Sequence, residues 1–302
     1  MMKIVIAGGT GFIGSALCNR LGELGHSLVI ISSRPAPAQL PRNREWAMWS
    51  PGQHGPWEQA VDDADVVINL AGEPIPAKRW TAAQKEKIRS SRINTTRALV
   101  VAMGKVKERA SLLINASAIG YYGPRGDEAV VEETEPGNDF VSRVCVEWEK
   151  EAQKAESLGV RVVCLRTGIV LGKGGGALAK MVLPFKLFGG GPIGSGRQWV
   201  SWIQLEDEVE LIVHLLQKEK ASGAVNATAP NPVTMKVLCQ TLGQVLHRPS
   251  WAPVPAFALR LLMGEIADMV VTGQRVLPAK AQRLGYTFRY PDLTEALRVS
   301  VN

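Results

Sequence analysis

The fold is decided by the stretch Lys3-Ile4-Val5-Ile6-Ala7-Gly8-Gly9-Thr10-Gly11-Phe12-Ile13-Gly14, which Ser-Ala-Leu-Cys-Asn-Arg-Leu follows at positions 15–21. An apolar run of strand length comes first, and it breaks into glycines spaced three residues apart. The residues that follow place Ile13, Leu17, Leu21 and Leu24 on one face of a helix. This stretch therefore predicts a strand, a tight turn and a helix.

The three spaced glycines each have a physical role in binding a dinucleotide. Gly8 permits the turn, Gly11 lets a pyrophosphate approach the backbone, and Gly14 lets the helix pack closely against the strand. The start of the helix then directs free N–H groups and the positive end of its dipole at the phosphates. Three glycines in a turn are often only a turn, but here a strand precedes them and a helix follows. We therefore predict a dinucleotide site.

The composition is that of a globular protein with a full hydrophobic core. The chain has 302 residues, of which 46% are hydrophobic, enough for one large domain or for a domain with an added lobe. The net charge is +7, but no run of five Lys or Arg residues occurs, so we expect no nucleic-acid partner. A basic surface instead suits small molecules that carry phosphate groups.

The cysteines and the apolar runs bear on where the protein works. Four cysteines, at positions 18, 145, 164 and 239, have no C-x-x-C spacing and stand in apolar or helical contexts. We therefore expect buried thiols and no metal site. The first residues begin a strand without a signal-peptide pattern, and no apolar run approaches membrane-spanning length. These features predict a cytoplasmic protein without a membrane partner.

Strand and helix patterns alternate through about the first 165 residues. After the first helix we expect a strand at 27–31, a short strand at 46–49, a strand at 65–73, a helix at 81–103, a strand at 111–117, a helix at 139–158 and a strand at 161–166. Such alternation predicts an α/β protein with a doubly wound parallel sheet of the NAD(P)-binding Rossmann type.

The end of the second strand indicates which dinucleotide binds. A site that selects NAD would need a carboxylate here for the ribose hydroxyls, whereas this chain has Ser33 and Arg34. A hydroxyl and a guanidinium suit the 2′-phosphate of NADP. A solvated arginine before a proline turn would have the same sequence. We predict NADP(H) rather than NAD as the cofactor.

Beyond Thr167 the pattern changes to glycine-rich loops, at 172–176 and 189–196, between short apolar elements. This change predicts a smaller C-terminal substrate lobe made of residues 169–196 and 229–302. Residues 1–168, with segments near 197–228, would form the NADP-binding domain, since a helix at 205–217 and a strand at 224–227 can rejoin the sheet. The loop before Arg197 could wrap a diphosphate, although a loop that only joins the lobes would look the same.

Several motifs resemble those of extended short-chain dehydrogenases/reductases, the group of nucleotide-sugar epimerases and dehydratases. They run in order along nearly the whole chain: Gly8-x-x-Gly11-x-x-Gly14, Asn69-Leu70-Ala71-Gly72, Ser117 before Tyr122-Gly123, Arg166-Thr167-Gly168 and Arg197-Gln198-Trp199. More narrowly, the Gly-Gly-Thr-Gly-Phe-Ile-Gly, Asn-Leu-Ala-Gly-Glu and Ser-Arg-Ile-x-Thr-Thr-Arg segments resemble the YfcH-type sugar-nucleotide epimerase subfamily.

The resemblance implies a set of cofactor-binding residues. It places the glycine turn on the pyrophosphate, the end of the second strand on the 2′-phosphate, and the segment after Asn69 along the adenosine side of the cofactor. Arg92 is implied as a further contact on the cofactor side. The full set is Gly8, Thr10, Gly11, Phe12, Ile13, Gly14, Ser33, Arg34, Leu70, Ala71, Gly72, Glu73 and Arg92.

The chain departs from the resemblance in its chemistry. The wider family uses a Tyr as general acid/base, assisted by a Lys four residues later on the same helix face and by a Ser. No Tyr-x-x-x-Lys occurs in this sequence, and Ala118 rather than Ser117 stands in the usual serine register. The candidate substitutes are Ser117, Tyr121 and Tyr122, with Glu73 nearby. Tyrosines at the end of a strand are also common packing residues.

Two hypotheses follow. The first is an NADP(H)-binding, epimerase-like oxidoreductase acting on a nucleotide sugar or a related polar carbonyl or alcohol compound, with Arg197 as a substrate-binding residue. The second is a redox-inactive NADP(H)-binding sensor or scaffold, which the missing Tyr-x-x-x-Lys favours. The partner is a small-molecule substrate in the first case, and a homodimer is compatible with both.

Overall fold

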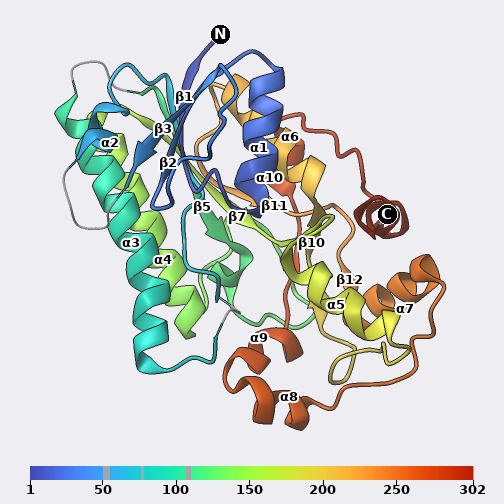
Figure 1. Cartoon of the computed structure of the whole chain (residues 1–302). Helices are drawn as coiled ribbons and strands as arrows, with labels where there is room; N and C mark the ends of the chain where they lie inside the picture. The colour runs from blue at the N-terminus through green and yellow to red at the C-terminus, as the bar shows by residue number, and fades with distance from the viewer. Residues whose placement is uncertain (50–54, 76–77, 107–109, 302) are drawn as a thin grey trace.

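The central element of the computed structural model is a sheet of seven parallel strands, in the order β11-β7-β5-β4-β1-β2-β3 (Figure 1). The structure describes residues 1–49, 55–75, 78–106 and 110–301. The strands are β1 (Lys3–Ala7), β2 (Ser27–Ser32), β3 (Arg44–Met48), β4 (Val66–Asn69), β5 (Leu112–Ala118), β7 (Arg161–Thr167) and β11 (Gly223–Ala227). This confirms the predicted doubly wound parallel sheet.

Helices cover both faces of the sheet because side chains alternate along each strand. Ile4 and Ile6 of β1 pack with α1 (Phe12–Glu23) and α6 (Leu205–Gln217) on one face. Val5 packs on the other face with α3 (Ala82–Lys105), near α4 (Phe140–Gln153). The remaining elements of this part are α2 (Pro56–Gln59), α10 (Ala279–Arg283) and the 3₁₀ helices η2 (Ile119–Tyr122) and η3 (Lys154–Leu158).

The strand expected at 65–73 is shorter in the structure, where β4 ends at Asn69. The Asn69 side chain explains this end, since its Oδ1 accepts the N–H of Ala71 at 3.2 Å and turns the chain out of the sheet. Its Nδ2 donates to Asn115 and Thr96 at 2.7 and 2.9 Å. Likewise, the helix expected at 139–158 is α4 followed by η3.

A second group of elements has a hydrophobic core of its own, with Leu171, Phe185, Trp202 and Leu242 at its centre. The helices that contribute to this core are α5 (Gly176–Lys186), α7 (Met235–Leu246) and α11 (Leu293–Val301), and the short helices α8 (Ala256–Met263) and α9 (Ile266–Val271) lie between α7 and α11 in the sequence. Its paired short strands are β8 (Ile169–Leu171) with β10 (Trp202–Gln204), and β9 (Trp199–Val200) with β12 (Val233–Thr234). We call these elements the C-terminal lobe.

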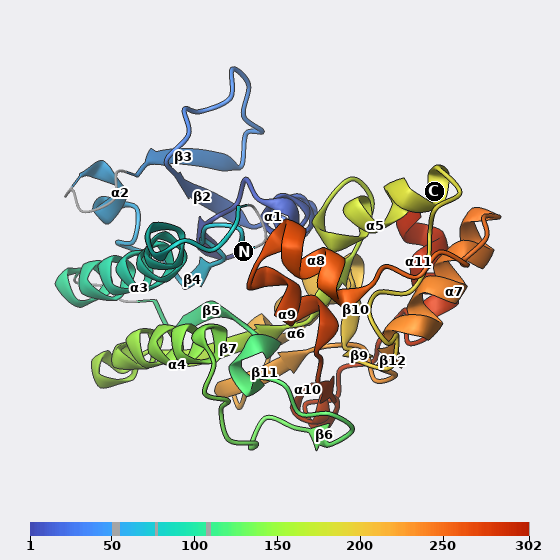
Figure 2. The same cartoon turned by 90° about the horizontal axis from the view of Figure 1, so that it is seen from below.

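The lobe lies beside the sheet, and α8 and α9 lie below the sheet in the view of Figure 1. Seen from below, α8 and α9 lie between α3 and α4 on one side and α5 and α7 on the other (Figure 2). A further strand pair, β6 (Ala129–Val130) with β13 (Arg275–Val276), joins the loop after β5 to the segment after α9. Lys85 of α3 forms an ion pair with Glu265 beside α9, which links the two parts directly. Among the described residues, no helix is both long and apolar enough to cross a bilayer.

Candidate functional site

The turn between β1 and α1 is tightly packed at two of its glycines and open at the third. Gly8 has a φ of 83°, and a Cβ placed on it would lie 2.6 Å from the carbonyl carbon of Leu70. A Cβ on Gly14 would lie 2.2 Å from the Gly8 oxygen. The nearest atom to a Cβ on the exposed Gly11 is 3.3 Å away, and Gly11 begins α1 without a side-chain cap. The turn therefore leaves room for a phosphate at the helix start.

The segment that follows β4 lies against this turn. Leu70 donates its N–H to Ala7 at 2.8 Å, and both Leu70 and Ala71 border the space next to Gly8. Gly72 is exposed, whereas Thr10 and Ile13 are half-buried. Since β4 and β2 flank β1 on opposite sides, the turn stands where the strand order reverses, the position at which doubly wound sheets bind ligands.

Ser33 and Arg34 are both exposed at the end of β2. The Arg34 backbone is fixed, since its N–H donates to Ser32 Oγ at 3.1 Å and its carbonyl accepts from Trp46 Nε1 at 3.0 Å. Within the described part of the chain, its guanidinium forms no ion pair. Arg34 is thus an exposed cation at the carboxyl end of the strand next to β1, as a site for a 2′-phosphate requires.

Arg92 is buried, with 9% of its surface exposed. Its Nη1 donates to the carbonyls of Glu73 and Ile88 at 2.9 and 3.0 Å, and its guanidinium lies 5.1 Å from the Trp148 ring centroid. Burial lowers the pKa of Arg92. A Cβ on Gly72 would lie 3.1 Å from the Arg92 Cζ, so the guanidinium lies directly against this loop.

Glu73, in turn, does not neutralise this buried cation. Its carboxylate pairs with Lys87 at 3.2 Å, and its N–H donates to Ser91 Oγ at 3.0 Å. Arg92 has no carboxylate partner among the described residues. A buried cation without an ion pair is costly, so a ligand with negative charge is expected near it.

Ser117, Tyr121 and Tyr122 come together around Arg166 at the end of β7. Arg166 binds Glu149 of α4 through two hydrogen bonds of 2.8 Å, and Ser117 Oγ donates to the same carboxylate at 2.6 Å. The Tyr121 ring centroid lies 3.4 Å from the Arg166 Cζ. Burial raises the pKa of Tyr121, which is half-buried.

Tyr122 is completely buried within this network. Its hydroxyl donates to Asn226 Oδ1 at 2.7 Å and accepts from Arg166 Nη1 at 2.9 Å. Burial raises the pKa of Tyr122 to about 12. The hydroxyl therefore joins η2 to β7 and β11 and presents no surface to a ligand in this structure, whereas Tyr121 remains partly accessible.

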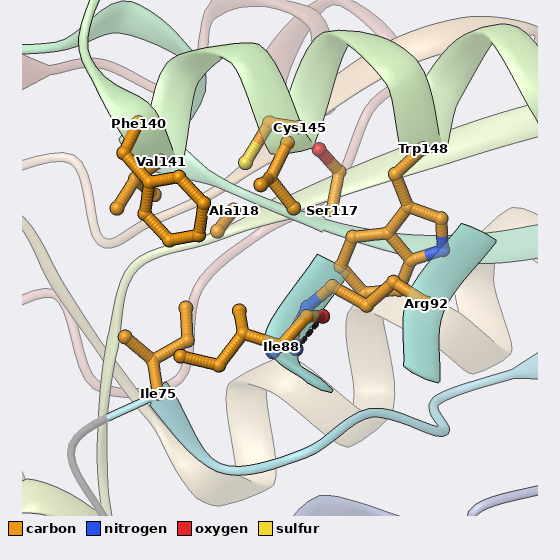
Figure 3. Close-up of a pocket in the computed structure, with 10 residues that line it drawn as sticks. Ile75, Ile88, Arg92, Ser117, Ala118, Phe140, Val141, Cys145 and Trp148 are labelled. Carbon is orange, nitrogen blue, oxygen red and sulfur yellow. Dashed lines mark hydrogen bonds between the residues drawn. The ribbon is translucent and has the colours of Figure 1, made fainter. Parts of the chain in front are cut away.

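A small cavity of about 90 Å³ lies between α3, α4 and the end of β5 (Figure 3). We call it the Arg92 cavity. Figure 3 shows Val141, Cys145 and Trp148 of α4 facing Ile88 and Arg92 of α3. Its lining residues are Ile75, Ile88, Arg92, Ser117, Ala118, Phe140, Val141, Val144, Cys145 and Trp148.

Most of these lining residues were missed by the sequence analysis. The signal that could have found the α4 side is its apolar repeat at positions 141, 144, 145 and 148, which also looks like an ordinary core face. Val141 and Cys145 are four residues apart and both line the cavity, so the wall has no Tyr and Lys at that spacing. Burial raises the pKa of Cys145 to about 12, which keeps this thiol neutral.

Phe12 has a second role that the sequence did not reveal. A Cβ on Gly175 would lie 2.3 Å from the Phe12 ring, and one on Gly172 would lie 2.8 Å from it. The ring is thus inserted into the 172–176 loop of the C-terminal lobe. The residue that begins α1 at the glycine turn also packs against the lobe.

Arg197 is exposed and lies in the lobe, away from the Arg92 cavity lining. Its N–H donates to Ser195 Oγ at 3.2 Å. The preceding glycines serve the packing of the protein itself, since a Cβ on Gly190 would lie 2.4 Å from the Phe185 ring and one on Gly191 would lie 2.2 Å from the Ala252 oxygen. The described residues contain no group of three His, Cys, Asp or Glu side chains that could hold a metal ion.

The sequence is similar to a known protein family and to several known proteins. Residues 4–227 match the NAD dependent epimerase/dehydratase family, and residues 254–299 match a domain of unknown function, DUF1731. The "Epimerase family protein SDR39U1 homolog, chloroplastic" of Arabidopsis thaliana is 42% identical over 98% of this chain and 86% of its own. "Epimerase family protein YfhF" of Bacillus subtilis is 43% identical over 98% of this chain and 97% of its own.

A solved structure has the same fold over its full length. The crystal structure of the human epimerase family protein SDR39U1 with NADPH superposes with a TM-score of 0.88 at 32% identity, covering 99% of each chain. The similarity includes both the sheet and the C-terminal lobe.

Proposed function

Because this chain belongs to the NAD dependent epimerase/dehydratase family, we propose that it binds NADP(H) and acts as an epimerase-like oxidoreductase on a small molecule. The observation that carries the proposal is the open glycine turn after β1 together with the exposed Arg34 at the end of the neighbouring strand β2. The turn fits a pyrophosphate, and the guanidinium fits a 2′-phosphate that NAD lacks.

The proposed cofactor site follows the edge of the sheet. Gly8, Thr10, Gly11, Phe12, Ile13 and Gly14 would hold the pyrophosphate with backbone N–H groups, and Ser33 with Arg34 the 2′-phosphate. Leu70, Ala71, Gly72 and Glu73 would line the cofactor, and Arg92 would supply a buried positive charge on its other side. When bound, NADP(H) supplies or accepts the hydride.

The proposed substrate class is a nucleotide sugar or a related polar carbonyl or alcohol compound. Arg197, which belongs to the C-terminal lobe, would bind the diphosphate of the substrate, since its side chain is exposed and cationic. The role of a catalytic hydroxyl would fall to Tyr121, which is partly accessible, while Ser117 and Tyr122 would position the end of β5 through Arg166 and Glu149.

A second candidate function is a redox-inactive NADP(H) sensor or scaffold. The observation that favours it is the largely apolar α4 side of the Arg92 cavity, where Val141 has no polar group and Cys145 has a neutral thiol. The YfcH-type subfamily, a cytoplasmic location and a homodimer remain predictions of the sequence.

Calorimetric titration with NADPH and NADH tests the cofactor proposal. We expect NADPH to bind at least tenfold more tightly than NADH. Equal affinities would contradict the 2′-phosphate assignment. Screening UDP-, GDP- and dTDP-sugars for NADPH or NADP⁺ turnover then separates the enzyme from the sensor, since a sensor binds the cofactor and turns over none of them.

A further inference from the structure

The α4 wall of the Arg92 cavity contains no carboxyl, phenol, imidazole or ammonium group. The cavity residues that stand four positions apart on this helix form three pairs: Val141 with Cys145, Phe140 with Val144, and Val144 with Trp148. These side chains are apolar or aromatic, except for Cys145, whose thiol is neutral. The polar atom of Trp148 is already used, since its Nε1 donates to Thr96 Oγ1 at 2.8 Å.

The rest of the cavity does not supply a proton either. Ile75, Ile88 and Ala118 are apolar, and the Ser117 hydroxyl donates its hydrogen to Glu149. Glu149 is in turn bound to Arg166 by two hydrogen bonds. Among the described lining residues, Arg92 is the remaining charged group, and a guanidinium keeps its proton at all ordinary pH values.

Such a cavity is poorly suited to a sugar carbon that alternates between alcohol and carbonyl. That reaction moves a proton on or off the oxygen in step with the hydride, which requires a general acid/base within hydrogen-bond reach. Each sugar hydroxyl buried against these apolar side chains without a hydrogen-bond partner would weaken binding. The cavity instead favours a reacting group that is flat and apolar and that accepts hydride on carbon.

We propose that the Arg92 cavity receives the conjugated C=C–C=O unit of an α,β-unsaturated carbonyl compound, which the protein reduces at its C=C bond. The proposal rests on the proposed binding of NADP(H). It replaces the sugar alcohol and the Tyr121 hydroxyl as the reacting groups, and it does not depend on what Arg197 binds. The positive charge of Arg92 stabilises the oxygen on which negative charge develops, without giving up a proton.

The proposed step is balanced in atoms and electrons. A hydride from NADPH forms a C–H bond at the β-carbon, and the π electron pair of the C=C bond moves through the α-carbon to the carbonyl oxygen. The resulting enolate takes a proton from water at the α-carbon. The substrate is reduced by two electrons to the saturated carbonyl compound while NADPH is oxidised to NADP⁺, and no protein side chain changes its protonation state.

The test compares 2-cyclohexenone with cyclohexanone, which share a ring and a carbonyl and differ in the C=C bond. With NADPH-saturated protein we expect NADPH consumption with 2-cyclohexenone, cyclohexanone as the product, and at least tenfold slower consumption with cyclohexanone. Formation of 2-cyclohexen-1-ol, comparable reduction of cyclohexanone, or no turnover of 2-cyclohexenone overturns the inference.

A binding measurement without turnover places the ligand. In the presence of NADP⁺, ligand-observed NMR should detect 2-cyclohexenone on the wild-type protein. Val144→Thr adds a hydroxyl to the cavity wall at nearly constant size and should weaken this binding about three- to tenfold. Val146→Thr, on the same helix but outside the lining, is the matched control and should bind as the wild type does.

The outcomes separate this inference from the proposed function. Failure of NADPH to bind in calorimetry overturns both. Normal NADPH binding together with unchanged 2-cyclohexenone binding in a folded Val144→Thr variant overturns only the inference, since the ligand then binds elsewhere. Circular dichroism melting curves verify that both threonine variants are folded.

Discussion

Arg166 and Glu149 form an ion pair with two hydrogen bonds of 2.8 Å in the interior, where 4% and 6% of their side chains are exposed. Arg166 is on β7 and Glu149 on α4, and Ser117 of β5 donates to the same carboxylate. The pair therefore joins three elements at the carboxyl edge of the sheet, directly behind the Arg92 cavity.

Removal of the Glu149 charge should destabilise the fold strongly. In Glu149→Gln the Arg166 guanidinium stays buried without a counter-charge, so we expect the free energy of unfolding to fall by about 3–5 kcal/mol. Urea unfolding measures it. The control is Glu133→Gln, which breaks the exposed pair with Arg283 and should change stability by about 0.5 kcal/mol or less. Equal effects of the two substitutions would contradict a structural role for the buried pair.

Two glycines of the turn should respond differently to substitution. Gly11→Val fills the open space over the helix start, so the variant should fold and lose NADPH binding. Gly14→Ala forces a Cβ to within 2.2 Å of the Gly8 oxygen, so this variant should have a lower melting temperature than the wild type. Melting curves and calorimetry distinguish the two. NADPH binding by folded Gly11→Val would place the phosphates elsewhere.

Arg34→Ala should abolish the preference for NADPH. One charge-assisted contact to the 2′-phosphate is lost, so we expect about a tenfold to hundredfold rise in the Kd for NADPH. The Kd for NADH should stay the same, because NADH has no phosphate at that position. Calorimetry with both cofactors checks this, and an equal loss of affinity for the two would mean that Arg34 acts only on the shape of the loop.

Glu208 should make stability depend on pH. The side chain is completely buried, its Oε1 accepts from Thr167 Oγ1 at 2.8 Å, and burial raises its pKa to about 8. The folded protein therefore keeps a proton that the unfolded chain releases above about pH 4.3. Its contribution to stability is full below that pH and declines as the pH rises towards 8.

Glu208→Gln removes this dependence. Near pH 4 the free energy of unfolding of the variant should be similar to that of the wild type. Near pH 8 it should be larger by on the order of a few kcal/mol, because Gln has no proton to lose. Urea unfolding across the range measures the difference. A difference that does not change with pH would show that Glu208 is ionised in the folded protein.

The sheet was predictable because its signals are local. The apolar run before Gly8 and the helical face after it are close together in the sequence, and the same strand and helix periods recur up to β7. The positions of the glycine turn and of Arg34 follow from that order, since parallel strands bring their carboxyl ends to one edge.

The polar network could not be predicted in the same way. Arg166, Glu149 and Tyr122 belong to different elements, and only the packing of α4 on β5 and β7 shows that they meet. A sequence gives no sign that the Tyr122 hydroxyl is enclosed by Asn226, which is 104 residues away. The Arg92 cavity was missed for the same reason, since its α4 side has the periodicity of ordinary core.

The Phe12 ring, held in the 172–176 loop, limits how this protein can be divided or recombined. A shortened chain that ended before Gly172 would expose the aromatic ring at the first residue of α1, next to the proposed site for the phosphates of a dinucleotide. A lobe transplanted from a relative would need glycines at the positions of Gly172 and Gly175, because a Cβ at either position would lie less than 3 Å from the ring. Exchange of lobes between relatives therefore has to include the turn after β1, and the two segments are expected to be inherited and engineered as one unit.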